Sequence, residues 1–175
     1  MAVQKRKFFD VSIEILNIST PVLAFNQEDL KGKMLRLDLS RFLKGKSTEG
    51  KFIITKKEDK LVAIMESFEM PLSYIRKLIG HGTSIIEDSF VVNCSDGKLR
   101  IKLFLITRKK VHRSVKNSLR KTAKQEVLSF VSGKTKQQIF DAVLDTILQK
   151  TILKKLKKIY PLGVCELRAV QTVKK

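Results

Sequence analysis

The chemistry that this sequence could perform begins with one basic run, from Thr107 to Lys124. The run holds eight lysines and arginines and one histidine, and it contains no acid. Lysine and arginine side chains neutralise phosphates but carry little information about base identity. The run therefore predicts a surface that holds a polyanion by its backbone charge and shape.

A helix from about Arg113 to Val131 is expected to position most of this run. At 100° per residue, Arg113, Lys116, Arg120 and Lys124 fall within about 80° of one another. This side of the helix should form a cationic ridge, and the opposite side should pack on a sheet. The residues expected on the packing side are Val111, Val115, Ser118, Leu119 and Thr122.

The alternative for any charge run is a solvated helix face with no partner. Ordinary solvated faces mix both signs of charge. From Lys98 to Lys124 the chain instead has eleven lysines and arginines and no acid. Polyanion binding is therefore the favoured interpretation. The composition agrees, because 36 basic and 17 acidic residues give a formal charge of +19, which repels itself unless a polyanion screens it.

Nucleic acid and an anionic membrane are the two obvious polyanions for such a chain. No stretch approaches the roughly 20 apolar residues of a spanning helix, and the N-terminus lacks the continuous apolar block of a signal peptide. Cys94 and Cys165 lie in strand-like contexts and are interpreted as reduced, buried thiols. These features predict a cytoplasmic nucleic-acid-binding protein without a membrane partner.

Catalytic motifs are weak throughout. Gly-Lys-Ser at 45–47 and Gly-Lys-Thr at 133–135 lack the first glycine of a phosphate-binding loop, since Ser40 and Leu128 occupy those positions. Gly-His-Gly at 80–82 reads as a helix-terminating turn. The cysteines and histidines show no zinc spacing, and the carboxylates show no pairing. We therefore expect no enzyme, cofactor, metal or small-molecule substrate.

The elements around the basic run are mostly strands, because hydrophobic residues alternate with polar ones through the first two thirds of the chain. Glu58-Asp59 and Asp96-Gly97 read as hairpin turns. The pattern predicts an α+β fold with a mainly antiparallel curled sheet or small β-barrel of about seven strands. The expected strands are residues 11–16, 34–40, 50–57, 60–68, the hairpin 89–107, and 164–170.

Three or four helices should flank this sheet. One is expected over 71–80, opened by Pro71, and another over 136–160, stopped by Pro161 and kinked near 149–151. Thr135 and Gln138 match a capping box at the start of the latter. No linker or repeat is evident. We expect a single domain over 1–175, β-rich at 8–106, helical at 113–160 and closed by a strand at 164–171.

Several segments together resemble a known family. They are "KFFDV" at 7–11, "YIRKLIGHGTSIIEDSFVVNCSDG" at 74–97, the basic "TRKK…KNSLRK", and "KKIYPLGVCELRAV" at 157–170. The chain resembles the S-three-A (S-one-e) family of archaeal and eukaryotic small-subunit ribosomal proteins. It departs from that family at 80–82, where members carry an arginine cluster, so the resemblance assigns no RNA contact to that loop.

The resemblance implies a structural protein on the platform of the small ribosomal subunit, near the messenger exit. Its partners would be the 3′ region of the ribosomal RNA and neighbouring small-subunit proteins. A free-standing RNA- or DNA-binding factor is the alternative. The candidate RNA-binding residues are Lys5, Arg6, Lys7, Arg108, Lys109, Lys110, His112, Arg113, Lys116, Arg120, Lys121 and Lys124.

Overall fold

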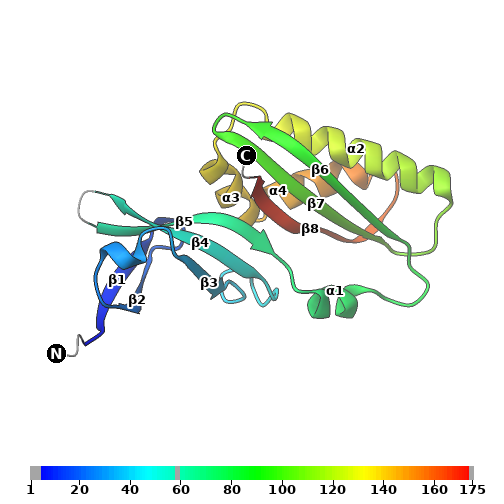
Figure 1. Ribbon diagram of the computed structural model, residues 1–175. Coiled ribbons are helices and arrows are strands. Elements are labelled where there is room, and N and C mark those ends of the chain that lie inside the picture. The colour runs from blue at the N-terminus through cyan, green and yellow to red at the C-terminus, as the bar shows by residue number, and fades with distance from the viewer. Residues whose placement is uncertain (1–4, 58–59, 174–175) are drawn as a thin grey trace. The chain divides into compact units, whose positions relative to one another are not determined.

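The computed structural model describes residues 5–57 and 60–173 and gives them eight strands and four α-helices (Figure 1). This confirms the predicted α+β class. The described residues form two compact units, one made of those up to Leu37 and of 50–67, the other of those in 38–49 and from Phe68 onward. The strands are β1 (Lys7–Ile13), β2 (Ile18–Ala24), β3 (Met34–Asp38), β4 (Glu49–Lys57), β5 (Lys60–Glu69), β6 (Ile85–Cys94), β7 (Gly97–Thr107) and β8 (Leu162–Val173).

The first unit is built on an antiparallel β1–β2 pair, with Phe8 opposite Leu23. β1 also runs parallel to β5, and β4 pairs with both β3 and β5, so the sheet is mixed. The strand order here is β2-β1-β5-β4-β3, and the end strands β2 and β3 do not pair with each other. Among the described residues the sheet is therefore open rather than a closed barrel. The predicted turn at Glu58-Asp59 lies outside the described residues.

β2 is the strand that the sequence interpretation missed. The expected strand over 11–16 stops at Ile13, because residues 14–16 form a 3-10 turn closed by Asn17 in the left-handed region at φ 52°. β2 then returns beside β1 with Pro21 opposite Asp10. Proline has no N–H to donate and is confined to sheet edges. β2 satisfies this rule because it ends the strand order.

The second unit contains the antiparallel strands β6, β7 and β8. The β6–β7 hairpin confirms the predicted turn, and Gly97 adopts φ +140° there, a backbone conformation that other residues rarely take. β7 is the central strand, and its residues from Leu103 to Thr107 are all buried. The three helices that follow β7 lie against one face of these strands (Figure 1). Phe90, Ile101 and Leu103 are buried on that face.

The helices are α1 (Leu72–Leu78), α2 (Arg113–Val131), α3 (Lys136–Leu144) and α4 (Ile147–Leu156). α1 and α2 agree with the predictions, and so does the capping box before α3, where the Thr135 Oγ1 accepts from the Gln138 amide. The predicted single helix over 136–160 is wrong, since the chain breaks at Asp145-Thr146 instead of kinking at 149–151. No described helix is long and apolar enough to cross a membrane.

The break between α3 and α4 contains no glycine or proline and is stabilised by a buried side chain of α4. Thr146 adopts φ 58°, and the turn leaves the carbonyls at the end of α3 without helical partners. The Gln149 Nε2 donates to the Val143 carbonyl at 3.1 Å, and the Thr146 amide reaches the same oxygen. Gln149 is 5 % exposed, so this polar side chain is buried where it satisfies the broken turn.

Candidate nucleic-acid interface

A buried hydroxyl pair anchors the basic loop that precedes α2. Thr107 is fully buried, and its Oγ1 accepts from the Ser84 amide at 3.0 Å and donates to the Lys109 carbonyl at 2.7 Å. The Ser84 Oγ in turn accepts from the Val111 amide at 3.2 Å. The two hydroxyls therefore fix the backbone of the loop through hydrogen bonds at Lys109 and Val111. Its side chains Arg108, Lys109, Lys110 and His112 are all exposed, as predicted.

The cationic ridge on α2 consists of Arg113, Lys116, Arg120 and Lys124, and we call it the α2 ridge. Arg113, Arg120 and Lys124 are exposed and Lys116 is half-buried. The structure therefore brings the four predicted residues together along one helix. Lys121 is also exposed but lies outside the ridge.

The ridge is not opposite the packing side, and this part of the prediction is wrong. The buried stripe of α2 is Leu119, Ala123, Val127 and Val131. Lys116, Arg120 and Lys124 each precede a stripe residue by three positions, which makes them its direct neighbours on the helix surface. Ser118, expected in the packing side, is exposed, whereas Val111, Val115 and Thr122 are half-buried.

This position places the α2 ridge along the β6 side of the helix. The Lys124 Nζ lies 5.6 Å from the centre of the Phe90 ring of β6. Arg120 lines a shallow hollow with Glu87, Asp88 and Lys102. Long basic side chains can cover apolar surface with their stems while the charge remains in water. The ridge thus shields the edge of the core and still presents its charges.

The charge of the loop and ridge is not compensated within the protein. Across 5–57 and 60–173, none of its lysines and arginines forms an ion pair with a carboxylate. Of the acids near it, Glu126 pairs with Lys155 and Glu87 with Arg168, and Asp88 accepts from the Ser89 amide. Like charges at i and i+4 cost about 0.2–0.5 kcal/mol per pair in an isolated helix. The arrangement therefore favours an external anion.

The short basic arm lies in the first unit and is described there alone. Lys5, Arg6 and Lys7 are exposed, and Lys7 begins β1. The Arg6 guanidinium lies over the Phe25 ring, 5.1 Å from its centre. Phe8, on β1, is itself 72 % exposed. The arm thus combines the predicted charge with an exposed aromatic surface.

The sequence interpretation left a further basic group out of the candidate set. Lys98, Arg100 and Lys102 occupy alternate positions of β7. Lys98 and Arg100 are exposed and Lys102 is half-buried, whereas the residues between them are buried. The signal was present as a period of two in charge along the strand, which puts all three on one face.

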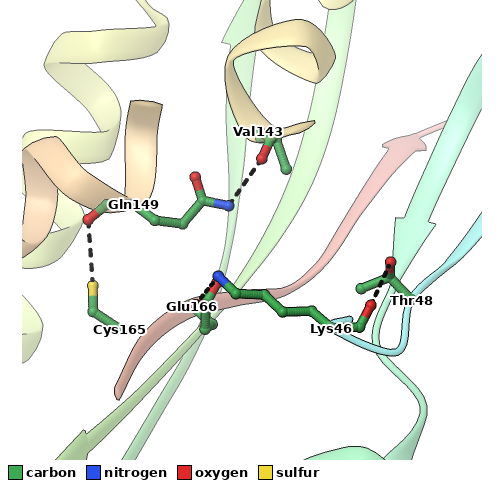
Figure 2. A network of polar contacts seen from close by, with 6 residues as sticks. All are labelled: Lys46, Thr48, Val143, Gln149, Cys165 and Glu166. Carbon is green, nitrogen blue, oxygen red and sulfur yellow. Dashed lines mark hydrogen bonds and ion pairs between the residues drawn. The ribbon is translucent and has the colours of Figure 1, made fainter. Parts of the chain in front are cut away.

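The two Gly-Lys-Ser/Thr stretches have structural roles in the fold. Figure 2 shows the Lys46 Nζ reaching the Glu166 carboxylate of β8, at 2.6 Å, and the Thr48 hydroxyl donating to the Lys46 carbonyl. In the second stretch, the Lys134 Nζ lies over the Phe130 ring and Thr135 caps α3. Neither lysine is free to hold a nucleotide phosphate. Within the described part of the chain, no cluster of metal-ligating side chains occurs.

The two cysteines differ in their surroundings. Cys165 is 7 % exposed, and its Sγ faces the Gln149 carbonyl at 3.8 Å (Figure 2). Burial, and secondarily the Glu166 charge, raises the pKa of the Cys165 thiol to about 12. Cys94 is only half-buried, so the prediction of a buried thiol is wrong for this residue, although partial burial raises the pKa of Cys94 as well. The thiolate is the reactive form, so Cys165 should be inert in the native protein.

We therefore expect Ellman's reagent at pH 8 to label Cys94 slowly and to leave Cys165 unlabelled until a denaturant is added. A Cys94→Ser variant should show no native labelling. Because the pKa of Cys165 is raised above its usual 9.0, its contribution to stability is complete below pH 9 and is lost as the pH rises toward 12. Labelling of native Cys94→Ser at the unfolded rate would contradict this burial.

Fold and surface together define the class of the protein as a basic α+β protein whose uncompensated charge gathers on one helix and its preceding loop. The model of the Ribosomal S3Ae family matches residues 8–175. The chain therefore belongs to the Ribosomal S3Ae family, which confirms the resemblance noted in the sequence and the expectation of a structural protein rather than an enzyme.

Curated relatives in archaea carry the name small ribosomal subunit protein eS1. The protein of Saccharolobus islandicus strain L.S.2.15 is 28 % identical over 147 residues, which cover 83 % of this chain and 67 % of that protein. The protein of Saccharolobus solfataricus is 30 % identical over 123 residues, covering 70 % and 59 %. That of Halorubrum lacusprofundi is 28 % identical over 102 residues, covering 58 % and 47 %.

Proposed function

We propose that this protein is a structural constituent of the small ribosomal subunit and that it binds ribosomal RNA through the α2 ridge and the loop before it. The observation that carries the proposal is the uncompensated charge of that surface in a member of the Ribosomal S3Ae family. A dense array of phosphates supplies the missing negative charge. Binding of this kind releases counterions, so the affinity should fall steeply as salt rises.

The contacts read backbone and shape rather than base sequence. Arginine and lysine supply almost all polar groups of the surface, and these side chains act mainly on phosphates. On the family resemblance, we place the protein on the platform near the messenger exit, with the 3′ region of the ribosomal RNA and neighbouring small-subunit proteins as partners. The arm of Lys5, Arg6 and Lys7 would add phosphate contacts from the first unit.

Sedimentation of a cell extract tests this proposal directly. We expect the protein to travel with small subunits through a sucrose gradient at moderate salt and to be released by high salt. The salt dependence distinguishes an electrostatic RNA contact from a purely apolar protein contact. Recovery at the top of the gradient under both conditions would overturn the proposal in favour of a free-standing RNA- or DNA-binding factor.

A further inference from the structure

The row of basic side chains on β7 is a surface in its own right. Lys98, Arg100 and Lys102 share one face of the strand, and the alternate residues Leu99 and Ile101 are fully buried on the other face. Neighbouring strand residues rise by about 3.3 Å, so the row extends for about 13 Å along the sheet. We call this set the β7 row.

No acid stands directly opposite the β7 row. On β6 the cross-strand partners of Lys98, Arg100 and Lys102 are Asn93, Val91 and Ser89. On β8 they are Val173, Gln171 and Ala169. Across the described residues, no carboxylate forms an ion pair with any member of the row. An opposite charge across from a strand residue stabilises a sheet, and this arrangement leaves the row without such compensation.

The face of the sheet that carries the β7 row is exposed around Lys98 and Arg100 but becomes buried further along β7, from Phe104 onward. Phe104 follows Lys102 on this face and is fully buried, between Glu87 on β6 and Glu166 on β8. Those two acids are engaged by Arg168 and Lys46. Around the row itself, Val91 remains 45 % exposed. The face therefore changes from a packed, internally paired region to an open, purely basic one.

Most of the β7 row lies apart from the α2 ridge. Lys124 of the ridge lies over Phe90, and Phe90 points to the helix-covered face of β6. Val91 and Ser89, the neighbours of Phe90, point to the opposite face, which carries the row. The two surfaces meet only at one end, where Lys102 of the row and Arg120 of the ridge line the same hollow. An RNA backbone held along the ridge therefore cannot place the same phosphates on Lys98 and Arg100.

We propose that the β7 row binds a second segment of RNA backbone, on the opposite side of the β6–β8 sheet from the α2 ridge. The inference rests on the proposed function, because it takes RNA as the polyanion. Phosphate is the matching group, since the row offers charge without an exposed aromatic ring on which a base could stack. The protein would then hold two RNA segments with one three-stranded sheet between them.

The test is a triple variant, Lys98→Gln, Arg100→Gln and Lys102→Gln, titrated with a transcript of the small-subunit RNA 3′ region. We expect the affinity at 0.1 M salt to fall about 10-fold and the slope of log K against log salt to fall by about two, as for up to three lost phosphate contacts. Hydroxyl-radical footprinting should show loss of one protected RNA segment while the segment protected by the ridge persists.

The matched control removes the same charge from exposed positions elsewhere in the second unit, by Lys154→Gln, Lys157→Gln and Lys158→Gln. It should leave affinity and footprint at the wild-type level. A single charge reversal, Arg100→Glu, should weaken binding more than Arg100→Gln, and it keeps the test valid if the triple variant folds poorly.

Two results would overturn the inference and leave the proposed function standing. One is wild-type affinity, slope and footprint in the triple variant when the ridge variant described below is impaired. The other is unchanged RNA binding together with loss of binding to vesicles containing phosphatidylglycerol, which would assign the row to a lipid surface. Unchanged RNA binding in both the triple and the ridge variants would instead remove the proposed RNA contact of the ridge itself.

Discussion

Replacing Arg113, Lys116, Arg120 and Lys124 together by glutamine is expected to lower the affinity for ribosomal RNA about 100-fold at 0.1 M salt and to reduce the salt slope by about three. Both values follow from the loss of up to four phosphate contacts, each of which contributes about 0.7–0.9 to the slope. Nitrocellulose filter binding across a salt series measures the two quantities together.

The fold should not suffer from this change. Among the described residues the ridge side chains have no carboxylate partners, so their neutralisation removes repulsion, which offsets the loss of the contact between Lys124 and the Phe90 ring. We expect the free energy of unfolding to stay within about 1 kcal/mol of the wild-type value. The control changes four exposed lysines of the α4 region, Lys150, Lys154, Lys157 and Lys158, to glutamine. Equal losses of affinity in both variants would mean that only net charge matters and that the ridge is not the site.

Truncating Phe104 to alanine should destabilise the protein by about 3–5 kcal/mol. The ring is fully buried on the central strand β7, and removing it leaves a cavity that the paired strands β6 and β8 cannot close. Such a loss is a large part of the stability of a typical domain. Urea unfolding followed by circular dichroism measures it.

Phe42→Ala provides the comparison, because it removes the same side chain in the same unit from a site that is 45 % exposed. Its cost should remain below about 1 kcal/mol. Similar midpoints for the two variants would show that the Phe104 region is loosely packed. That outcome would also weaken the claim that the face beside the β7 row is closed at this end.

The sequence was sufficient where one local signal determined the structure. The limits of α2, the Thr135 cap and the β6–β7 turn all follow from neighbouring residues, and all three are observed. It was insufficient where the structure depends on contacts that no local pattern encodes. β2 was not predicted because Pro21 argues against a strand until its edge position is known, and the break at Thr146 is stabilised by a buried hydrogen bond from Gln149 to the end of α3.

The candidate site was likewise predicted correctly in part. The basic residues could be counted from the sequence, and all candidates except the half-buried Lys116 are exposed as expected. The direction of the α2 ridge was wrong because Val111 and Val115, near the start of the helix, were taken to mark the packing side. The stripe that begins at Leu119 decides that orientation. The single-domain organisation stays a prediction.

The contacts of Thr107 and Ser84 have a consequence for how the protein meets its partner. They fix the backbone of residues 108–111 during folding, although the two side chains are 23 positions apart in the chain. Ordering one residue costs about 1–2 kcal/mol of conformational entropy. For this loop that cost is met when the protein folds. Under the proposed function, the loop would bind RNA in a conformation that it already holds, without a folding step coupled to binding.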